Sequence, residues 1–211
     1  MIPSDEAEWF RERLIRWSEG NLRSFPWRDH DATFYEVFMA EMFLRRTRAD
    51  VVGNVIPEFL QRYPTMTELA EANQDELAEV IRPMGLQNTR SRGLMELSAE
   101  VNGTLPRSAE ALRQLPQVGP YVANATLCFA EGAALPIIDR NVERVYTRYF
   151  GDTWSEADTA SKTEMALAIM DLDRPRQFNL GLLDFAAAMC RAREPRCSRC
   201  PMARQCLSVA R

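Results

Sequence analysis

The chain has 211 residues, 46% of them hydrophobic and 27% charged, with a formal net charge of -4, which suits one sizeable core or two small ones. No apolar run approaches the ~18 residues of a membrane span, and residues 1–9 are acidic where a signal peptide would be basic, so we expect a cytoplasmic protein without membrane contact. His30 is the only histidine and Lys162 the only lysine, which excludes His-based triads, most zinc hydrolase sites and nearly all amine chemistry.

Helical periodicity dominates the sequence, and no convincing alternation typical of strands appears, so we predict an all-α fold. Short segments rich in Pro, Gly and Asn separate the expected helices. In chain order these helices span residues 5–19, 34–47, 49–62, 67–72, 74–81, 89–101, 108–114, 119–129, 141–150 and 177–189. Residues 152–158 read as an acidic surface stretch.

Arginines gather in two places although the chain as a whole is acidic. Arg45, Arg46 and Arg48 form one group. The other lies in residues 190–211 and consists of Arg191, Arg193, Arg196, Arg199, Arg204 and Arg211. Such groups either form a solvated face or provide a local positive field for nucleic acid, and composition alone leaves both open.

A carboxylate lies on the apolar stripe of the helix expected at residues 34–47. Glu41 follows Val37 by four residues and Phe38 by three, which places it among core positions. Burial raises the pKa of a glutamate, which suits a general acid, although pairing with a buried arginine is the alternative. The preceding aromatic residues Phe25, Trp27 and Tyr35 are expected to pack in the core or to stack on a ligand.

Residues 115–123 (LPQVGPYVA) form a Pro/Gly turn between two expected helices. Backbone N–H groups in such a turn, at a helix start, can hold a phosphate without a charged side chain. An ordinary helix turn is the alternative.

Asp139, in residues 136–142 (PIIDRNV), occupies the position expected for a helix N-cap, because the apolar residues of 142–150 follow it at helical spacing. A helix start also keeps a carboxylate ionised while it faces a cleft. Capping alone and capping combined with catalysis are both compatible with this pattern.

Four of the five cysteines lie close together, in the spacing Cys190-x6-Cys197-x2-Cys200-x5-Cys206. Four thiolates within a short loop can hold one cubane cluster, whereas a structural zinc site more commonly shows two separated C-x2-C pairs. The spacing therefore predicts a [4Fe-4S] cluster rather than zinc. The fifth cysteine, Cys128, is expected in the core.

These motifs together resemble the helix-hairpin-helix DNA glycosylases of the endonuclease III superfamily. The resemblance implies two helical domains flanking a DNA-binding cleft: a six-helix barrel carrying the hairpin at residues 24–136, and a cluster domain made of residues 1–23 and 137–211. In that family the cluster holds a basic loop against DNA and takes no part in bond cleavage. The expected partner is double-stranded DNA with a mismatched or damaged base, bound by a monomer.

The resemblance also implies roles for individual residues. Asp139 corresponds to the catalytic carboxylate, since it follows Tyr121 by the eighteen residues that the family keeps between these positions. Glu41 would protonate the departing base, and Tyr121 would line the base pocket. The residues implied to contact DNA are Arg45, Arg46, Leu86, Gln87, Gln117, Val118, Gly119 and Tyr121. Among them Leu86 would wedge into the duplex, or else serve as a helix-end contact, and Arg45 or Arg46 would suit an orphaned guanine.

Two departures from the family patterns carry information. The hairpin usually has Gly-Val-Gly where this chain has Gln117-Val118-Gly119, so a left-handed conformation at Gln117 would be strained. Tyr121 stands where bifunctional relatives place a lysine, which implies a monofunctional enzyme.

The branch of the family sets the expected substrate. Residues 25–28 (FPWR) and Glu41 are similar to the adenine and thymine mismatch branch, and the chain ends soon after Cys206, where adenine glycosylases usually carry a further domain. We therefore expect excision of thymine or uracil opposite guanine. Adenine excision opposite guanine or 8-oxoguanine is the first alternative, and a non-catalytic iron-sulfur DNA-binding protein is the second.

Overall fold

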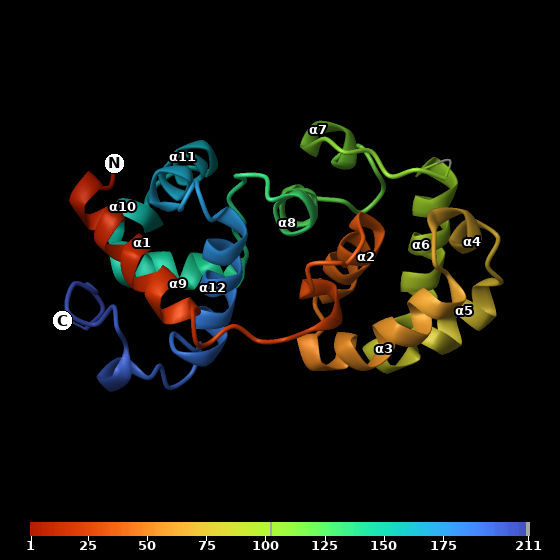
Figure 1. Ribbon diagram of the computed structural model, residues 1–211, viewed down its shortest axis with the longest axis horizontal. Helices are drawn as coiled ribbons and strands as arrows, with labels where there is room; N and C mark the ends of the chain where they lie inside the picture. The colour runs from red at the N-terminus through yellow and green to blue at the C-terminus, as the bar shows by residue number, and fades with distance from the viewer. Residues whose placement is uncertain (102, 210–211) are drawn as a thin grey trace. The chain divides into compact units, whose positions relative to one another are not determined.

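The computed structural model describes residues 1–101 and 103–209, and within these ranges every regular element is a helix and no strand occurs, which confirms the all-α prediction (Figure 1). The elements are α1 (Ser4–Ser18), η1 (Pro26–Arg28), α2 (Phe34–Leu44), α3 (Ala49–Arg62), α4 (Met66–Ala70), α5 (Gln74–Ile81), η2 (Arg82–Met84), α6 (Gln87–Val101), α7 (Ala109–Leu112), α8 (Pro120–Glu131), α9 (Arg140–Phe150), α10 (Asp152–Ser155), α11 (Thr159–Ile169), α12 (Pro175–Ala188) and η3 (Cys197–Arg199). None of the described helices is long and apolar enough to cross a membrane. Arg211, the last of the C-terminal arginines, lies outside the described residues.

The helices form two compact units. Unit 1 consists of Met1–Arg23 and Gly132–Arg211, and unit 2 consists of Ser24–Glu131. Unit 1 therefore contains both ends of the chain, and unit 2 is inserted as one continuous segment.

Unit 1 packs around α9, whose buried residues recur at helical spacing. Val142, Val145, Tyr146 and Tyr149 face the core, and Gly151 ends the helix with a φ of 59°, a conformation that favours glycine. Helices α1 and α12 pack against each other, and α12 also contacts α9 (Figure 1). The cysteine loop follows α12, so the core of unit 1 directly supports it.

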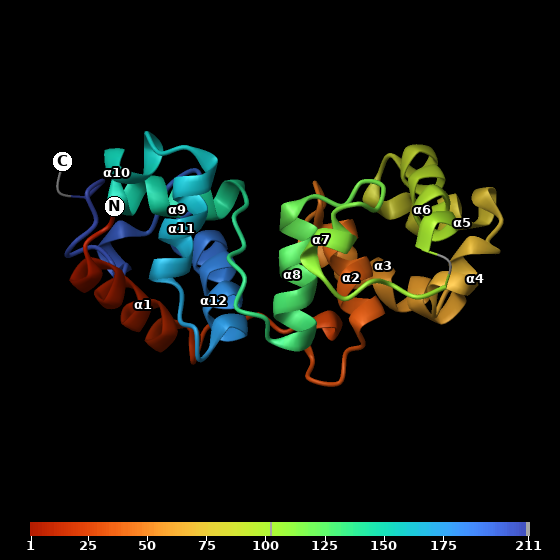
Figure 2. The same ribbon diagram turned by 90° about the horizontal axis from the view of Figure 1, so that it is seen from above.

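Unit 2 is centred on α2, which lies beside α8 (Figure 2). A reciprocal capping box starts α2: the Thr33 side chain accepts from the backbone of Glu36, and the Glu36 carboxylate accepts from the backbone of Thr33. Almost every side chain from Phe34 to Phe43 is buried, which explains why the apolar stripe on this helix is so wide. Helices α4 and α5 pack on α6 in the same unit.

The predicted helices and the structure differ most at residues 152–169. This stretch contains α10 and α11. The sequence instead suggested an acidic surface segment at residues 152–158 and predicted no further helix before residue 177. Asp158 caps α11 by accepting from the Ser161 N–H, but the helix buries only Met165, Ala166 and Ile169. So narrow an apolar face gives a weak periodic signal.

Candidate functional site

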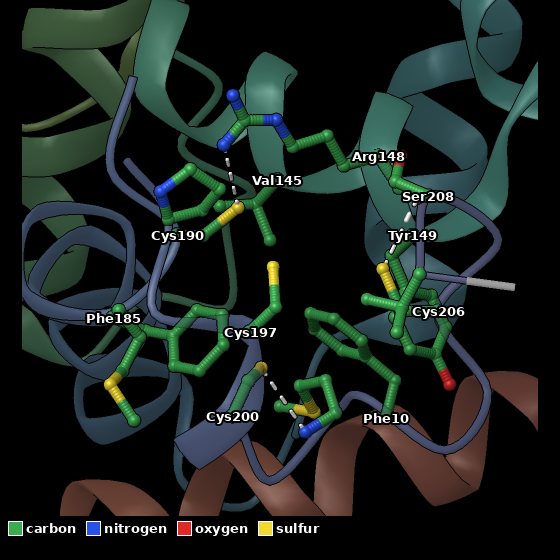
Figure 3. Close-up of a pocket in the computed structure, with 14 residues that line it drawn as sticks. Phe10, Val145, Arg148, Tyr149, Phe185, Cys190, Cys197, Cys200, Cys206 and Ser208 are labelled. Carbon is green, nitrogen blue, oxygen red and sulfur yellow. Dashed lines mark hydrogen bonds between the residues drawn. The ribbon is translucent and has the colours of Figure 1, made fainter. Parts of the chain in front are cut away.

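The four cysteines of the C-terminal motif line one cavity in unit 1 (Figure 3). The cavity has a volume of about 220 Å³. Its apolar wall comes from Phe10, Val145, Tyr149, Phe185 and Met202. The loop therefore brings its thiols to one mostly apolar cavity.

Two arginines of α9 hold this loop through its backbone. Arg148 donates to the carbonyl oxygens of Arg191 at 2.7 Å and Ala192 at 3.1 Å, and its Nη1 lies 3.5 Å from the Cys190 sulfur. Arg144 donates to the Cys190 carbonyl at 2.9 Å. The loop shape is thus fixed by the folded helix and not by the cysteines alone.

The protein environment favours the protonated thiols of Cys200 and Cys206. Burial raises the pKa of Cys200 to about 11, and the charges of the other three cysteines act in the same direction. Burial also raises the pKa of Cys206. Across residues 1–101 and 103–209, no three His, Cys, Asp or Glu side chains are grouped as one metal ion requires. The four sulfurs share a cavity without forming a single-ion site.

The predicted hairpin lies between α7 and α8 in unit 2. Gln117 has a φ of 64°, so the glutamine does adopt the left-handed conformation in which the family usually has glycine. Its carbonyl accepts a hydrogen bond from Arg45 Nη1. The first backbone hydrogen bond of α8 runs from Ala123 N–H to Gly119 O. The N–H groups of Tyr121 and Val122, which precede Ala123, therefore lie at the start of the helix, where backbone N–H groups can bind an anion.

The Gln117 side chain has room because it lies against a glycine. A Cβ added at Gly93, on α6, would lie 1.8 Å from Gln117 Nε2 and 2.8 Å from its Cδ. The missing methyl group of Gly93 therefore provides the space that the glutamine occupies.

Asp139 caps α9, as its position in the sequence predicted. Its Oδ1 accepts from the backbone N–H groups of Asn141 at 2.8 Å and Val142 at 2.7 Å, and its Oδ2 accepts from Asn141 Nδ2 at 2.7 Å. Each carboxylate oxygen can accept two hydrogen bonds, which leaves Oδ2 one further acceptor position. The side chain is only partly buried, so a second partner can reach it.

Glu41 lies on α2 and is 2% exposed, which places the carboxylate in the interior of unit 2, as the helical spacing predicted. Tyr121 is the second residue of α8 and is half-buried. Trp27 is buried and stacks on the half-buried Phe25, with ring centroids 4.6 Å apart. Tyr35, the second residue of α2, is half-buried and donates to the Tyr63 carbonyl. Core packing, one of the two roles expected for Trp27 and Tyr35, therefore describes them.

Leu86 is unusual among the large apolar residues of unit 2, because its side chain is 64% exposed. It has a φ of 54° and stands immediately before α6, which begins with Gln87. Arg46 also has a positive φ, of 66°, and its side chain is exposed. Non-glycine residues with a positive φ are uncommon, and such strained positions cluster at functional sites.

Sequence reasoning missed Arg90. This α6 residue donates to the carbonyl oxygens of Gly85 and Arg45 and to the hydroxyl of Thr47. Two of these three acceptors are backbone atoms, which any residue type provides, so no sequence pattern points to the contact.

The Pro/Gly turn between α7 and α8 has the order of elements for which the helix-hairpin-helix proteins are named. Residues 39–170 match the family described as "HhH-GPD superfamily base excision DNA repair protein". The match covers more than half of the chain, and the chain belongs to this superfamily, which confirms the resemblance drawn from the motifs.

The relatives resemble the chain over different shares of their length. A thymine-DNA glycosylase of Aeropyrum pernix is 36% identical over 98% of this chain and 96% of the relative. The human adenine DNA glycosylase is 31% identical over 95% of this chain but only 39% of the relative. A solved structure, that of a thermostable thymine-DNA glycosylase, superposes with a TM-score of 0.92 at 32% identity and covers 98% of this chain and 97% of the other.

Proposed function

We propose that this protein is a monofunctional DNA glycosylase that, as a monomer, releases thymine or uracil opposite guanine from double-stranded DNA. The observation that carries the proposal is Asp139, which the start of α9 orients through three N–H donors while one acceptor position of Oδ2 stays available. A carboxylate held in this way can act on a sugar cation without rearranging.

The reaction breaks the bond between the base and C1′ of the sugar and adds water at C1′. Asp139 stabilises the positive charge that develops on the sugar and accepts a proton from the attacking water. Glu41, buried on α2, donates a proton or hydrogen bond to the departing base, and Tyr121 lines the pocket that receives it.

The DNA contacts follow from the turns of unit 2. The hairpin residues Gln117, Val118 and Gly119 lie against a phosphate, to which Gln117 and Gly119 present backbone N–H groups, while the Val118 N–H donates to Leu115 O within the turn. The exposed Leu86 wedges into the duplex with Gln87 beside it. We further assign unit 2, which ends at Glu131, to the barrel domain expected at residues 24–136, and unit 1 to the cluster domain expected at residues 1–23 and 137–211.

Cys190, Cys197, Cys200 and Cys206 would hold a [4Fe-4S] cluster. The fit is supported by their shared cavity, its mostly apolar wall and the four-thiolate spacing in one short loop. The bound cluster supplies a fixed centre for the basic loop rather than a reactive group.

Purified protein should accordingly be yellow-brown and contain about four irons and four acid-labile sulfides per chain. Metal and sulfide analysis, together with the visible absorption spectrum, checks this stoichiometry. A colourless protein with one zinc per chain would contradict the assignment.

The adenine alternative is less well supported, because the human adenine DNA glycosylase is 31% identical to this chain and the Aeropyrum pernix thymine-DNA glycosylase is 36% identical. A non-catalytic DNA-binding protein would have no need of both Asp139 and the buried Glu41.

Base release from a panel of duplexes tests the proposal. The panel contains T or U opposite G, and A opposite G or 8-oxoguanine, in one sequence context. We expect release of thymine and uracil from the G mispairs. Preferential release of adenine would support the first alternative, and no release from any duplex would support the second.

A further inference from the structure

We propose that Asp184 and Asn179 of α12 are positioning residues that hold the chain at both places where it passes between the units, and that they thereby keep Asp139 aligned with the nucleotide whose base is released. The proposal deepens the function proposed above and rests on it. In that function Asp139 of unit 1 acts on the same nucleotide as Glu41 and Tyr121 of unit 2. The segments that join the units therefore decide how often these three side chains are aligned.

The first crossing lies between Arg23, which belongs to unit 1, and Ser24, which begins unit 2. Asp184 binds Arg23 in two ways. Its Oδ2 accepts from the Arg23 backbone N–H at 2.8 Å, and its Oδ1 accepts from Arg23 Nε at 2.7 Å. Asp184 is 1% exposed, and an unpaired buried carboxylate is costly, so this contact persists as long as unit 1 is folded. The last residue before unit 2 is thus held by both its backbone and its side chain.

The second crossing lies at residues 131–132, and from there the chain runs without a helix to Asp139. Asn179 holds this segment, because its Nδ2 donates to the Leu135 carbonyl at 3.1 Å. The asparagine is 2% exposed and lies 44 residues away from Leu135 in the sequence. Leu135 precedes Asp139 by only four residues. The contact therefore fixes the segment that leads from unit 2 to the proposed catalytic carboxylate.

One helix provides both contacts. Asn179 and Asp184 are five positions apart on α12, which is about 140° beyond one full turn, so their side chains leave the helix on different sides. Between them Gly181 lies so close to α1 that an added Cβ would be 2.9 Å from the Ser18 Cβ. Helix α12 also packs on α9, which Asp139 caps. Both crossings and Asp139 therefore share one support within unit 1.

The composition of α12 indicates that this role is selective. Asn179 and Asp184 are the two polar residues that α12 buries, and each of them contacts a crossing. The other residues that this helix buries are Pro175, Phe178, Leu180, Gly181, Leu182, Phe185 and Ala186. Buried polar and ionic groups can often be replaced by apolar ones without loss of stability, so packing alone does not require polar side chains at these two positions.

The test measures single-turnover base release and amide hydrogen exchange on the same preparations, well below the Tm of each variant. Asp184→Asn and Asn179→Ala should each lower the release rate at saturating enzyme by about tenfold, because a small misplacement of a catalytic group is costly. Affinity for a duplex with a tetrahydrofuran abasic-site analogue should fall less than the rate. Amides of residues 132–138 should exchange faster in Asn179→Ala, and those of residues 20–25 in Asp184→Asn. Amides of α9 should be unchanged in both.

Asp171→Asn is the matched control. Asp171 is also a buried aspartate of unit 1 that accepts from a backbone N–H and a guanidinium, but both belong to Arg174 at the start of α12 and not to a crossing. This variant should keep the release rate and the exchange of residues 132–138 even where its Tm falls. Arg23→Gln combined with Asp184→Asn leaves no unpaired buried charge, so it should fold and show the same loss of rate as Asp184→Asn.

A loss of rate in Asp171→Asn equal to that in Asp184→Asn would reduce Asp184 to ordinary core packing and overturn the proposal. Unchanged exchange of residues 132–138 in Asn179→Ala would overturn it as well. If the unaltered protein releases no base, the glycosylase function fails, and faster exchange at both crossings in the variants would still support their attachment to α12.

Discussion

Replacing Asp139 with asparagine should stop base release, with a loss of at least about 100-fold, and leave the binding of mismatched DNA largely intact. Asparagine keeps an oxygen that can accept from the Asn141 and Val142 N–H groups, so the cap of α9 and the stability of unit 1 are retained. What is lost is the negative charge, which matters only when positive charge develops on the sugar. Single-turnover release, duplex binding and Tm measured on the same preparation separate these effects.

Asp158→Asn is the matched control for this experiment. Asp158 is also an N-cap in unit 1, where it accepts from Ser161 N–H at the start of α11. This control variant should keep full activity. If Asp139→Asn loses binding and stability in parallel with activity, Asp139 is a structural cap and its catalytic role is wrong.

The second large effect concerns the product: the enzyme should leave an intact abasic site, and borohydride should trap no covalent protein-DNA adduct. A lyase step needs an amine that forms an imine with C1′ of the sugar, and the phenol of Tyr121 cannot supply one. The only lysine, Lys162, lies in unit 1, with its Nζ 3.2 Å from Glu143 Oε2 and over the Trp154 ring. Its side chain is only 20% exposed, which further limits its use as a nucleophile.

Trapping is measured by gel shift of the denatured complex after turnover in borohydride. Tyr121→Lys should gain trapping that the unaltered protein lacks. If the unaltered protein is trapped efficiently, loss of the adduct in Lys162→Arg would identify Lys162 as the amine, and its persistence would point to the N-terminus. Either result would contradict a monofunctional enzyme.

The sequence predicted those parts of the protein in which spacing alone carries the information. The start of α9 at Asp139 followed from a capping residue and a strong apolar repeat, and both appear in the structure. Glu41 was placed in the interior because a helix that is apolar on nearly all sides leaves little choice of face. The four cysteines could be placed at one site because a short loop keeps them close together in space, and they do line one cavity.

The remaining features depend on contacts between distant segments. Helix α11 buries few large side chains, so its periodicity is weak. Arg90 reaches two carbonyl groups and one hydroxyl that lie up to 45 residues away in the sequence. Every residue type carries a backbone carbonyl group, so the sequence does not indicate which carbonyl groups accept from Arg90. Only the fold shows that Arg90 joins two turns.

The glutamine in the hairpin couples two distant positions of unit 2. A methyl group added at Gly93 would lie 1.8 Å from Gln117 Nε2, so alanine at position 93 requires the glutamine side chain to turn away from α6. Alanine favours a helix over glycine by about 1 kcal/mol. When residue 117 is glycine, no side chain has to move, so Gly93→Ala should raise Tm more in a Gln117→Gly background than in the unaltered protein. The effects of the two substitutions on stability should therefore be non-additive.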